Sequence, residues 1–134
     1  MMMKHQDVDP TLNALAECVI GAAIAVHREL GPGFQEITYG RALAIELECL
    51  DIAYELEVPV TLTYRGRSIG EGRIDVIIEK RLVLELKATE TSAKAFRRQV
   101  AAYLKAGHFD LGLVINFHAT VLRDGIIRVA NTKP

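Results

Sequence analysis

The chain has 134 residues, which is enough for one domain with a substantial core and too few for two ordinary domains. Half of the residues are hydrophobic and a quarter are charged, which is typical of soluble globular proteins and excludes disordered, collagen-like and disulfide-stapled chains. The 16 Lys and Arg against 17 Asp and Glu give a net charge of -1, so the basic excess that indicates a nucleic-acid-binding protein is absent. We expect a single domain over residues 1–134, with residues 1–8 as a loose tail.

The two cysteines and the apolar segments indicate a compartment. Cys18 and Cys49 lie in predicted helices at a spacing that fits no zinc or redox motif, so we expect buried free thiols in a reducing environment. The first residues contain no apolar stretch of the kind found in signal peptides. Charged residues interrupt the apolar helix at 12–30, which predicts a buried helix and no membrane span. We therefore expect a cytoplasmic protein.

The first half of the chain predicts two helices. Asp9-Pro10 opens the first, because Asp can accept hydrogen bonds from the first-turn amides and Pro is preset for the first helical position. Apolar residues then recur three or four positions apart as far as Leu30, and Gly31-Pro32-Gly33 ends the helix. A second helix is predicted from about Gln35 to Leu50. Its apolar side consists of Tyr39, Leu43, Leu47 and Leu50.

The second half predicts strands around one further helix. The period shortens towards two over 58–64, a turn follows at 64–67, and strands are predicted at 68–78 and 81–87. A helix from about 93 to 106, capped by Thr91-Ser92, follows, and the apolar run at 111–117 is typical of a strand buried on both faces. Arg123-Asp124-Gly125 turns into a last strand at 126–130. The side chains of the helix predicted to face the core are Phe96, Val100, Tyr103 and Leu104.

The alternation of apolar residues predicts the register of the hairpin between 74–78 and 82–87. Because a buried face must be apolar on both strands, the expected pairs are Ile78 with Leu82, Val76 with Leu84 and Ile74 with Leu86. Lys80 then lies at the tip, with Glu79 opposite Arg81.

The same register brings Asp75 directly opposite Glu85 on the other face, with Lys87 two residues further on. Cβ atoms at such positions lie about 4.5–5.5 Å apart. Two carboxylates at this distance repel each other unless a cation lies between them, and Mg²⁺ or Mn²⁺ suits carboxylate oxygens. The lysine could orient a phosphate or water, or stabilise developing charge. Alternatively, the three residues form ordinary ion pairs on a solvated sheet surface, since such triplets arise freely by chance.

Three further residues bear on this choice. Gln99 and Tyr103 are four positions apart and so lie on one face of the helix that follows Lys87. Taken alone, this spacing favours a half-buried core position for Tyr103, with Gln99 flanking it. Glu36 stands near the start of the second helix, where the helix dipole favours a carboxylate without any function. The residues around Gln99 are locally basic and could contact phosphates or form a charged outer face; they are Lys94, Arg97, Arg98 and Lys105.

The segment Gly33-Phe34-Gln35-Glu36-Ile37-Thr38-Tyr39 resembles the signature of the GxxExxY proteins, a small bacterial and archaeal family of the PD-(D/E)xK nuclease superfamily. The similarity covers nearly the whole chain, with Ile74 where the superfamily name has Pro. The segments that carry it are 26–31, 84–88, 99–104, 116–117 and 124–126.

The resemblance implies an α/β fold, a restriction-endonuclease-like mixed β-sheet flanked by helices, with core order αβββαβ and an extra N-terminal helix. It also implies that Glu36, Asp75 and Glu85 bind a divalent metal and that Lys87 activates or orients the attacking water. The pair Gln99 and Tyr103 resembles the QxxxY element of RecB-like nucleases, which helps to bind nucleic acid.

Two functions follow as expectations. The first is a metal-dependent nuclease with catalytic Asp75, Glu85 and Lys87 that hydrolyses phosphodiester bonds of DNA, or of RNA, with Mg²⁺ or Mn²⁺. The second is a non-catalytic binding or assembly module with the same fold, acting as an accessory subunit or a homodimer. The near-neutral charge and small size motivate this alternative, because they leave little surface for gripping a duplex.

Overall fold

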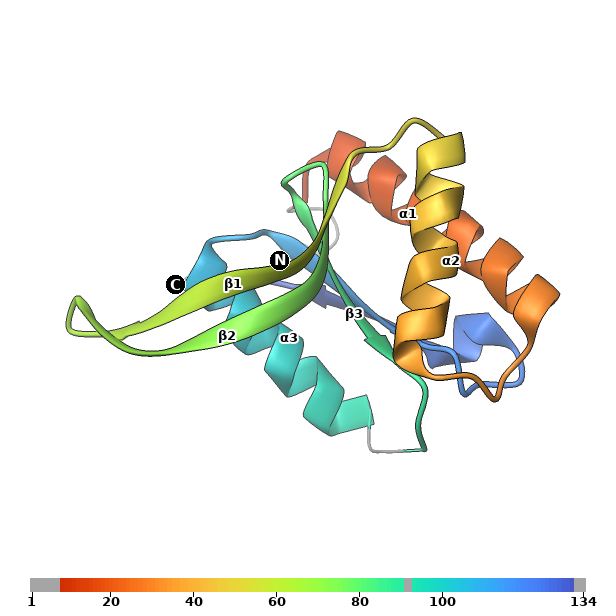
Figure 1. Cartoon of the computed structure of the whole chain (residues 1–134). Helices are drawn as coiled ribbons and strands as arrows, with labels where there is room; N and C mark the ends of the chain where they lie inside the picture. Colours follow the sequence, from red (N-terminus) through yellow and green to blue (C-terminus); the bar gives the residue numbers. More distant parts are fainter. Residues whose placement is uncertain (1–7, 91–92, 132–134) are drawn as a thin grey trace, which may run out of the picture.

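The computed structural model describes residues 8–90 and 93–131. The order of elements agrees with the expected order, and the predicted α/β class with a mixed sheet and an extra N-terminal helix is confirmed (Figure 1). The predicted cap Thr91-Ser92 and residues 1–7 of the predicted tail lie outside the described residues. The elements are α1 (Pro10–Leu30), α2 (Glu36–Cys49), β1 (Tyr54–Tyr64), β2 (Arg67–Ile78), β3 (Leu82–Lys87), α3 (Ala93–Gly107), β4 (Leu111–Asn116), the 3-10 helix η2 (Leu122–Gly125) and β5 (Ile126–Ala130).

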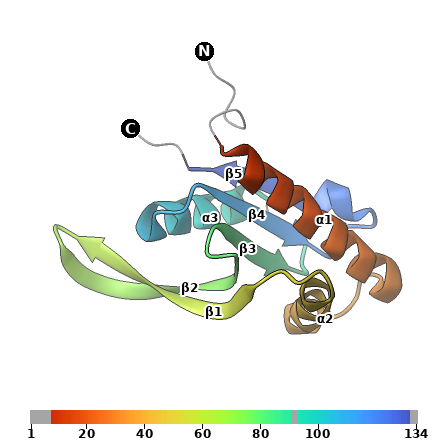
Figure 2. The same ribbon diagram turned by 90° about the horizontal axis from the view of Figure 1, so that it is seen from above.

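One five-stranded sheet in the order β1-β2-β3-β4-β5 forms the centre of the fold. Strands β3 and β4 are parallel because α3 connects them as a crossover, and the other neighbours are antiparallel. Helices α1 and α2 cover one face of the sheet and α3 covers the other (Figure 2). The distal halves of β1 and β2 extend beyond these helices as a two-stranded arm (Figure 1).

Both faces of the central strands are buried, as predicted for the apolar run in β4. Val76, Leu84 and Leu113 pack in the cluster below α1 and α2. Ile77, Val83 and Val114 pack below α3. Such two-sided burial explains why β3 and β4 are almost continuously apolar.

Helix α1 begins and packs as its sequence predicts. The Asp9 carboxylate accepts a hydrogen bond from the Thr11 N–H at 2.8 Å, and Pro10 occupies the first turn. The stripe through Leu12, Val19 and Val26 is buried. Among the described residues, α1 is the one helix that could cross a membrane by length and composition, a criterion that core helices also meet.

Three predictions about burial are wrong. Cys18 and Cys49 are exposed free thiols, because each lies off the apolar stripe of its helix. Leu50 is 48% exposed, because it follows the end of α2. Val8, predicted as part of the tail, is buried in the core cluster of α1 and α2.

The hairpin register is confirmed for two of the three predicted pairs, Ile78 with Leu82 and Val76 with Leu84. The third pair is wrong. Ile74 is buried in the cluster below α3, whereas Leu86 belongs to the cluster below α1 and α2. The ladder between β2 and β3 ends at Val76, so the alternation of faces that it imposes ends there too.

The predicted pairing of Glu79 with Arg81 is also wrong. Arg81 forms an ion pair with Asp9 at 3.0 Å and donates to the Thr11 hydroxyl, so it joins the hairpin to the start of α1. Glu79 instead accepts a hydrogen bond from the Ala53 N–H at 2.9 Å. Glu79 and Lys80 have φ values of 52° and 58°, so both lie in the turn of the hairpin. Glu79 is therefore not placed across a strand pair from Arg81.

The close approach of α3 to β4 requires a glycine at position 112, and this generates a stability prediction. A Cβ added there would lie 2.6 Å from Val100 Cγ1, so Gly112→Ala is expected to lower the free energy of unfolding by about 1–3 kcal/mol in urea titrations. Gly21→Ala in α1 is the control, because no atom lies within 4 Å of its new Cβ, and it should raise stability by up to about 1 kcal/mol. Equal effects of the two substitutions would contradict this packing.

Candidate active site

Strands β2 and β3 separate at Asp75 and Glu85. Their ladder includes Val76 with Leu84 but not the next position. There, the Asp75 N–H donates to Glu85 Oε1 at 3.2 Å, and the Leu86 N–H donates to Asp75 Oδ2 at 2.9 Å. The two residues predicted to face each other are therefore in contact, through side chain to main chain hydrogen bonds and not through strand pairing.

Strand β1 is irregular at the same level. Leu56 pairs with Val76 and Val58 pairs with Ile74, but Glu57 between them has a φ of 51° and does not pair with Asp75. This left-handed conformation costs a residue with a side chain roughly 1–2 kcal/mol. Asp75 thus lies where both neighbouring strands interrupt their ladders, and backbone strain of this kind gathers at functional sites.

Glu85 is the most perturbed carboxylate of this site. It is only 3% exposed, and burial raises its pKa to about 7, with the nearby charge of Asp75 adding to the rise. The hydrogen bond from the Asp75 N–H and the charge of Lys87 act in the opposite direction. A carboxyl group poised near neutral pH at the end of a strand is typical of functional sites.

Lys87 follows Glu85 on the same face of β3. Its Nζ lies 3.9 Å from Glu85 Oε2 and 4.9 Å from the centroid of the Phe96 ring in α3. The side chain is 18% exposed, so the ammonium group sits between a carboxylate and an aromatic face with limited access to water. This arrangement holds a positive charge beside the two carboxylates.

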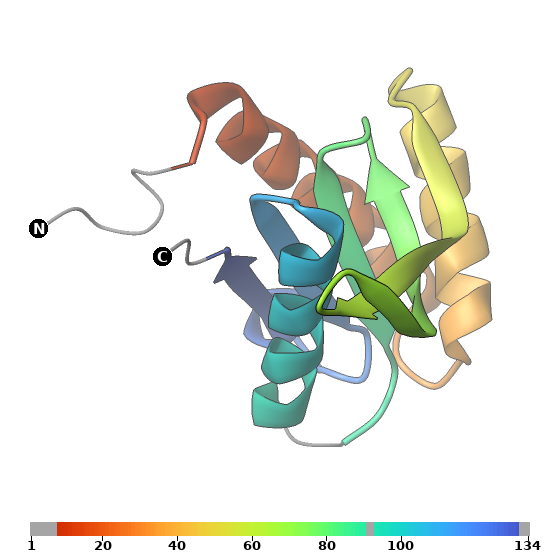
Figure 3. The same ribbon diagram turned by 90° about the vertical axis from the view of Figure 1, so that its left-hand side faces the viewer.

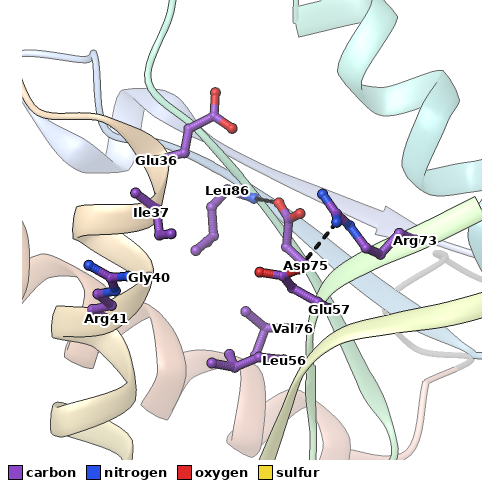
Figure 4. Close-up of a pocket in the computed structure, with 10 residues that line it drawn as sticks. All are labelled: Glu36, Ile37, Gly40, Arg41, Leu56, Glu57, Arg73, Asp75, Val76 and Leu86. Carbon is purple, nitrogen blue, oxygen red and sulfur yellow. Dashed lines mark hydrogen bonds and ion pairs between the residues drawn. The ribbon is translucent and has the colours of Figure 1, made fainter.

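Asp75 also lines a cleft of about 430 Å³ between α2 and the strands β1 and β2 (Figure 4). Glu36, exposed in the first turn of α2, lies on the opposite wall. Glu57 and Arg73 form an ion pair of 3.2 Å at the rim. Exposed Ile37 and Leu56 give the cleft a partly apolar lining.

The position of Glu36 depends on Tyr39, which the sequence predicted only as an apolar residue. Its hydroxyl donates to the Gly31 carbonyl at 2.6 Å and accepts from the Phe34 N–H at 3.2 Å. Its ring stacks on Phe117, with centroids 4.3 Å apart and 3° between the planes. These contacts fix the Gly-Pro-Gly corner and hence the start of α2. The signal available in the sequence was the place of Tyr39 at the end of the signature segment.

Asn116 is a second residue whose role sequence analysis did not predict. Its Oδ1 accepts from the Thr89 N–H at 3.3 Å and its Nδ2 donates to the Thr89 carbonyl at 2.8 Å. The next residue, Phe117, donates its N–H to the Lys87 carbonyl at 2.8 Å. Together these bonds hold the chain that leaves β3 beside Lys87. The signal was a single amide at the end of an otherwise apolar strand.

Gln99 and Tyr103 lie apart from the cleft. Both are half-buried on α3, and the Tyr103 ring packs over Gly72 of β2, where an added Cβ would lie 2.7 Å from the ring. Neither residue lines the cleft with Asp75. The structure therefore brings Asp75, Glu85 and Lys87 together, places Glu36 across the cleft from Asp75, and leaves Gln99 and Tyr103 on the α3 side of the sheet.

The donor set at the divergence of β2 and β3 fits a hard divalent cation. Asp75 and Glu85 are in contact, and burial together with the nearby charge of Asp75 raises the pKa of Glu85, so a cation there would stabilise both carboxylates. Within residues 8–90 and 93–131, however, no three His, Cys, Asp or Glu side chains converge closely enough to hold a metal. Glu36 is the nearest candidate for a third ligand by its place on the cleft wall.

A mixed sheet flanked by helices on both faces, with an Asp on one strand in contact with a Glu-x-Lys on the next, defines a restriction-endonuclease-like protein. Residues 13–129 match the family model of the PD-(D/E)XK nuclease superfamily, and the chain belongs to this superfamily. Its nucleases act on nucleic acid and generally use divalent metals. Searches of the curated proteins and of the solved structures gave no match.

The raised pKa of Glu85 predicts a pH-dependent effect of Glu85→Gln on the metal-free protein. The folded-state pKa of about 7 lies above the ordinary value of 4.5, so the folded protein binds this proton more tightly than the unfolded chain does. Protonation of Glu85 therefore stabilises the wild-type fold at low pH, and this contribution to the free energy of unfolding is lost as pH rises through 7. Gln stays neutral and keeps the acceptor for the Asp75 N–H. Between pH 5 and 8.5 the variant should gain roughly 2 kcal/mol relative to wild type.

Urea unfolding in EDTA at the two pH values measures this gain. Glu29→Gln removes an exposed carboxylate of α1 and serves as the control. A difference between Glu85→Gln and wild type that does not grow with pH would contradict the assignment of the raised pKa to Glu85.

Tyr39→Phe tests how the corner before α2 is held. The substitution keeps the ring stack on Phe117 but removes the hydroxyl that bonds the Gly31 carbonyl and the Phe34 N–H. We expect a loss of about 1–3 kcal/mol in the free energy of unfolding. Tyr54→Phe is the control, because its hydroxyl bonds the exposed side chain of Glu48, and it should have the smaller effect. If Tyr54→Phe costs as much, the Tyr39 hydroxyl is not the clamp.

Proposed function

We propose that the protein is a metal-dependent nuclease of the GxxExxY type that hydrolyses phosphodiester bonds of DNA, with RNA as the alternative substrate. The observation that carries the proposal is the contact between Asp75 and Glu85, with the Lys87 ammonium 3.9 Å from Glu85. Membership of the PD-(D/E)XK nuclease superfamily supports it independently. We further propose that the chain is a single domain that works in the cytoplasm.

In this proposal Asp75 and Glu85 hold Mg²⁺ or Mn²⁺, and Glu36 supplies a third carboxylate from the opposite wall of the cleft. The ion, when bound, neutralises charge on the scissile phosphate and makes water a stronger nucleophile at neutral pH. Carboxylate oxygens and few protein ligands suit Mg²⁺, which keeps several waters. The open cleft beside Asp75 leaves room for those waters and for the substrate.

The other residues act on the substrate directly. Water attacks phosphorus, the bond to the leaving oxygen breaks, and negative charge builds on the non-bridging oxygens. Lys87, held between Glu85 and the Phe96 ring, offers its ammonium to that charge in a partly dry setting, where an ionic hydrogen bond is strong. Gln99 and Tyr103 position the nucleic acid along α3.

A second candidate function is a non-catalytic binding module with the nuclease fold, acting as an accessory subunit or a homodimer. One observation favours it, namely that no three potential ligands converge within the described parts of the chain. A domain that only binds does not need two acidic residues here, because the neutral amides Asn and Gln would accept the same N–H hydrogen bonds without the cost of burying a charge at Glu85.

Incubation with single- and double-stranded DNA and RNA in Mg²⁺ or Mn²⁺ tests the choice. We expect cleavage of at least one of these substrates, reduced at least about 100-fold by Asp75→Asn and by Lys87→Met, because each removes charge that acts on the transition state. The exposed control Glu29→Gln should cleave like wild type. No cleavage above the Asp75→Asn background on any substrate would overturn the nuclease. Calorimetric Mn²⁺ binding that Glu85→Ala abolishes would then still identify a metal site in a binding module.

A further inference from the structure

The charges of the chain are segregated in a way that the net charge of -1 conceals. Residues 58–70 and 93–109 contain none of the 17 Asp and Glu but six of the 16 Lys and Arg. The first segment forms the outer part of the arm and the second is α3 with the turn that follows it. The six residues are Arg65, Arg67, Lys94, Arg97, Arg98 and Lys105.

The fold places these two segments side by side (Figure 3). Between them lies a groove of about 550 Å³, which we call the arm–α3 groove. On the α3 side the groove is lined by the small side chains of Ala101 and Ala102. Its ionisable groups are Lys105 and His108. None of the described residues that line it is acidic. The lining residues are Leu62, Thr63, Ala101, Ala102, Lys105, Ala106, His108, Ala130 and Asn131.

The tip of the arm also carries basic side chains, next to exposed apolar ones. Tyr64 is 63% exposed and Ile69 is 69% exposed, so a ring and an aliphatic side chain are accessible at the tip. The Arg65 guanidinium lies over the Tyr64 ring at 5.9 Å from its centroid, and Arg67 is exposed beside it. Arginines with an exposed aromatic ring suit phosphates and the bases attached to them.

Helix α3 connects the groove with the candidate active site. Phe96 in its first turns contacts Lys87, and Lys105 in its last turn lines the groove. Nine residues of helix span about 13 Å, which is roughly four nucleotide steps of a DNA strand. Tyr103, between the two ends, packs on Gly72 of β2, three residues before Asp75. A polymer that reaches from the site to the groove would therefore follow one helix.

We propose that the arm–α3 groove binds the sugar–phosphate backbone of the nucleic acid about four nucleotides from the bond that is cleaved. The proposal rests on the proposed nuclease function and adds a second contact to it. Charge complementarity carries it, because two basic segments without any Asp or Glu border this groove in a chain of net charge -1. The groove thus makes binding to a phosphate polymer compatible with an overall acidic protein.

Binding of a fluorescent oligonucleotide of about 20 nucleotides in EDTA, where cleavage cannot occur, tests the groove. The triple variant Arg65→Gln, Arg67→Gln, Lys105→Gln should bind at least about 10-fold more weakly. The slope of the logarithm of its binding constant against the logarithm of the salt concentration should be smaller by about two to three. The control removes three exposed charges elsewhere, by Arg28→Gln, Lys80→Gln and Arg123→Gln, and should stay within about twofold of wild type.

A small diester separates this inference from the nuclease itself. Bis(p-nitrophenyl) phosphate cannot span the distance to the groove, so wild type and groove variant should hydrolyse it equally in Mn²⁺, whereas the KM for oligonucleotides rises in the variant alone. The groove is overturned if the groove variant binds the oligonucleotide as tightly as wild type, if the control loses as much affinity, or if wild type does not bind at all. It is also overturned if the groove variant loses affinity only for vesicles of anionic phospholipid and not for the oligonucleotide. If wild type hydrolyses neither substrate but the groove variant still binds more weakly, the nuclease fails and the groove stands.

Discussion

The reciprocal hydrogen bonds between Asp75 and the strand that carries Glu85 are the constraint on which the candidate site depends. In an uninterrupted ladder, main-chain groups would satisfy one another and both carboxylates would project from the sheet. Here the Asp75 N–H is satisfied by Glu85 and the Leu86 N–H by Asp75, so two side chains replace strand pairing. A buried N–H without an acceptor would cost roughly 1–3 kcal/mol, which makes both carboxylates structural as well as chemical. The same bonds hold the two acidic groups together despite their repulsion. Burial of Glu85 is the main reason that its pKa is raised, and the nearby charge of Asp75 adds to the rise.

Aromatic and amide side chains position the rest of the site around the point where β2 and β3 separate. Phe117 follows β4, stacks on Tyr39 and ties its N–H to the Lys87 carbonyl, so one residue joins the corner before α2 to the end of β3. Asn116 secures the chain just beyond Lys87. Because Glu36 and Lys87 are both positioned through this pair of residues, the start of α2 and the end of β3 cannot shift independently. The apolar core thus sets the geometry of a polar site.

Periodicity predicted the elements well because each is an amphipathic or fully apolar segment, and the register followed wherever the ladder is regular, as at Val76 and Leu84. It failed at Ile74, since side-chain acceptors can end a ladder without any change in the apolar pattern. The partners of Glu79 and Arg81 depended on which distant segments pack against the hairpin tip, namely Ala53 and the start of α1. The exposure of Cys18 likewise depended on how wide a face of α1 the sheet covers. Burial and partners are harder to predict for charged residues and cysteines than for periodically spaced apolar residues, because many tertiary arrangements satisfy a charge or a thiol.

The near-zero net charge initially argued against nucleic acid, but net charge is an average over the surface and a polymer meets only part of it. Acidic residues occupy the cleft side, where Glu36, Glu57 and Asp75 gather, and a divalent ion would offset part of that charge. Residues 58–70 of the arm and α3 contain no acidic residue, and Glu71 of β2 pairs with Thr61, so basic side chains outnumber acidic ones there. Their attraction acts over the screening length of roughly 8–10 Å. A phosphate chain is therefore attracted along the arm and α3, and it meets carboxylates where it reaches Asp75. Such polarity favours a substrate that arrives along the helix, and it makes a cation at the acidic end a requirement for close approach of the scissile phosphate.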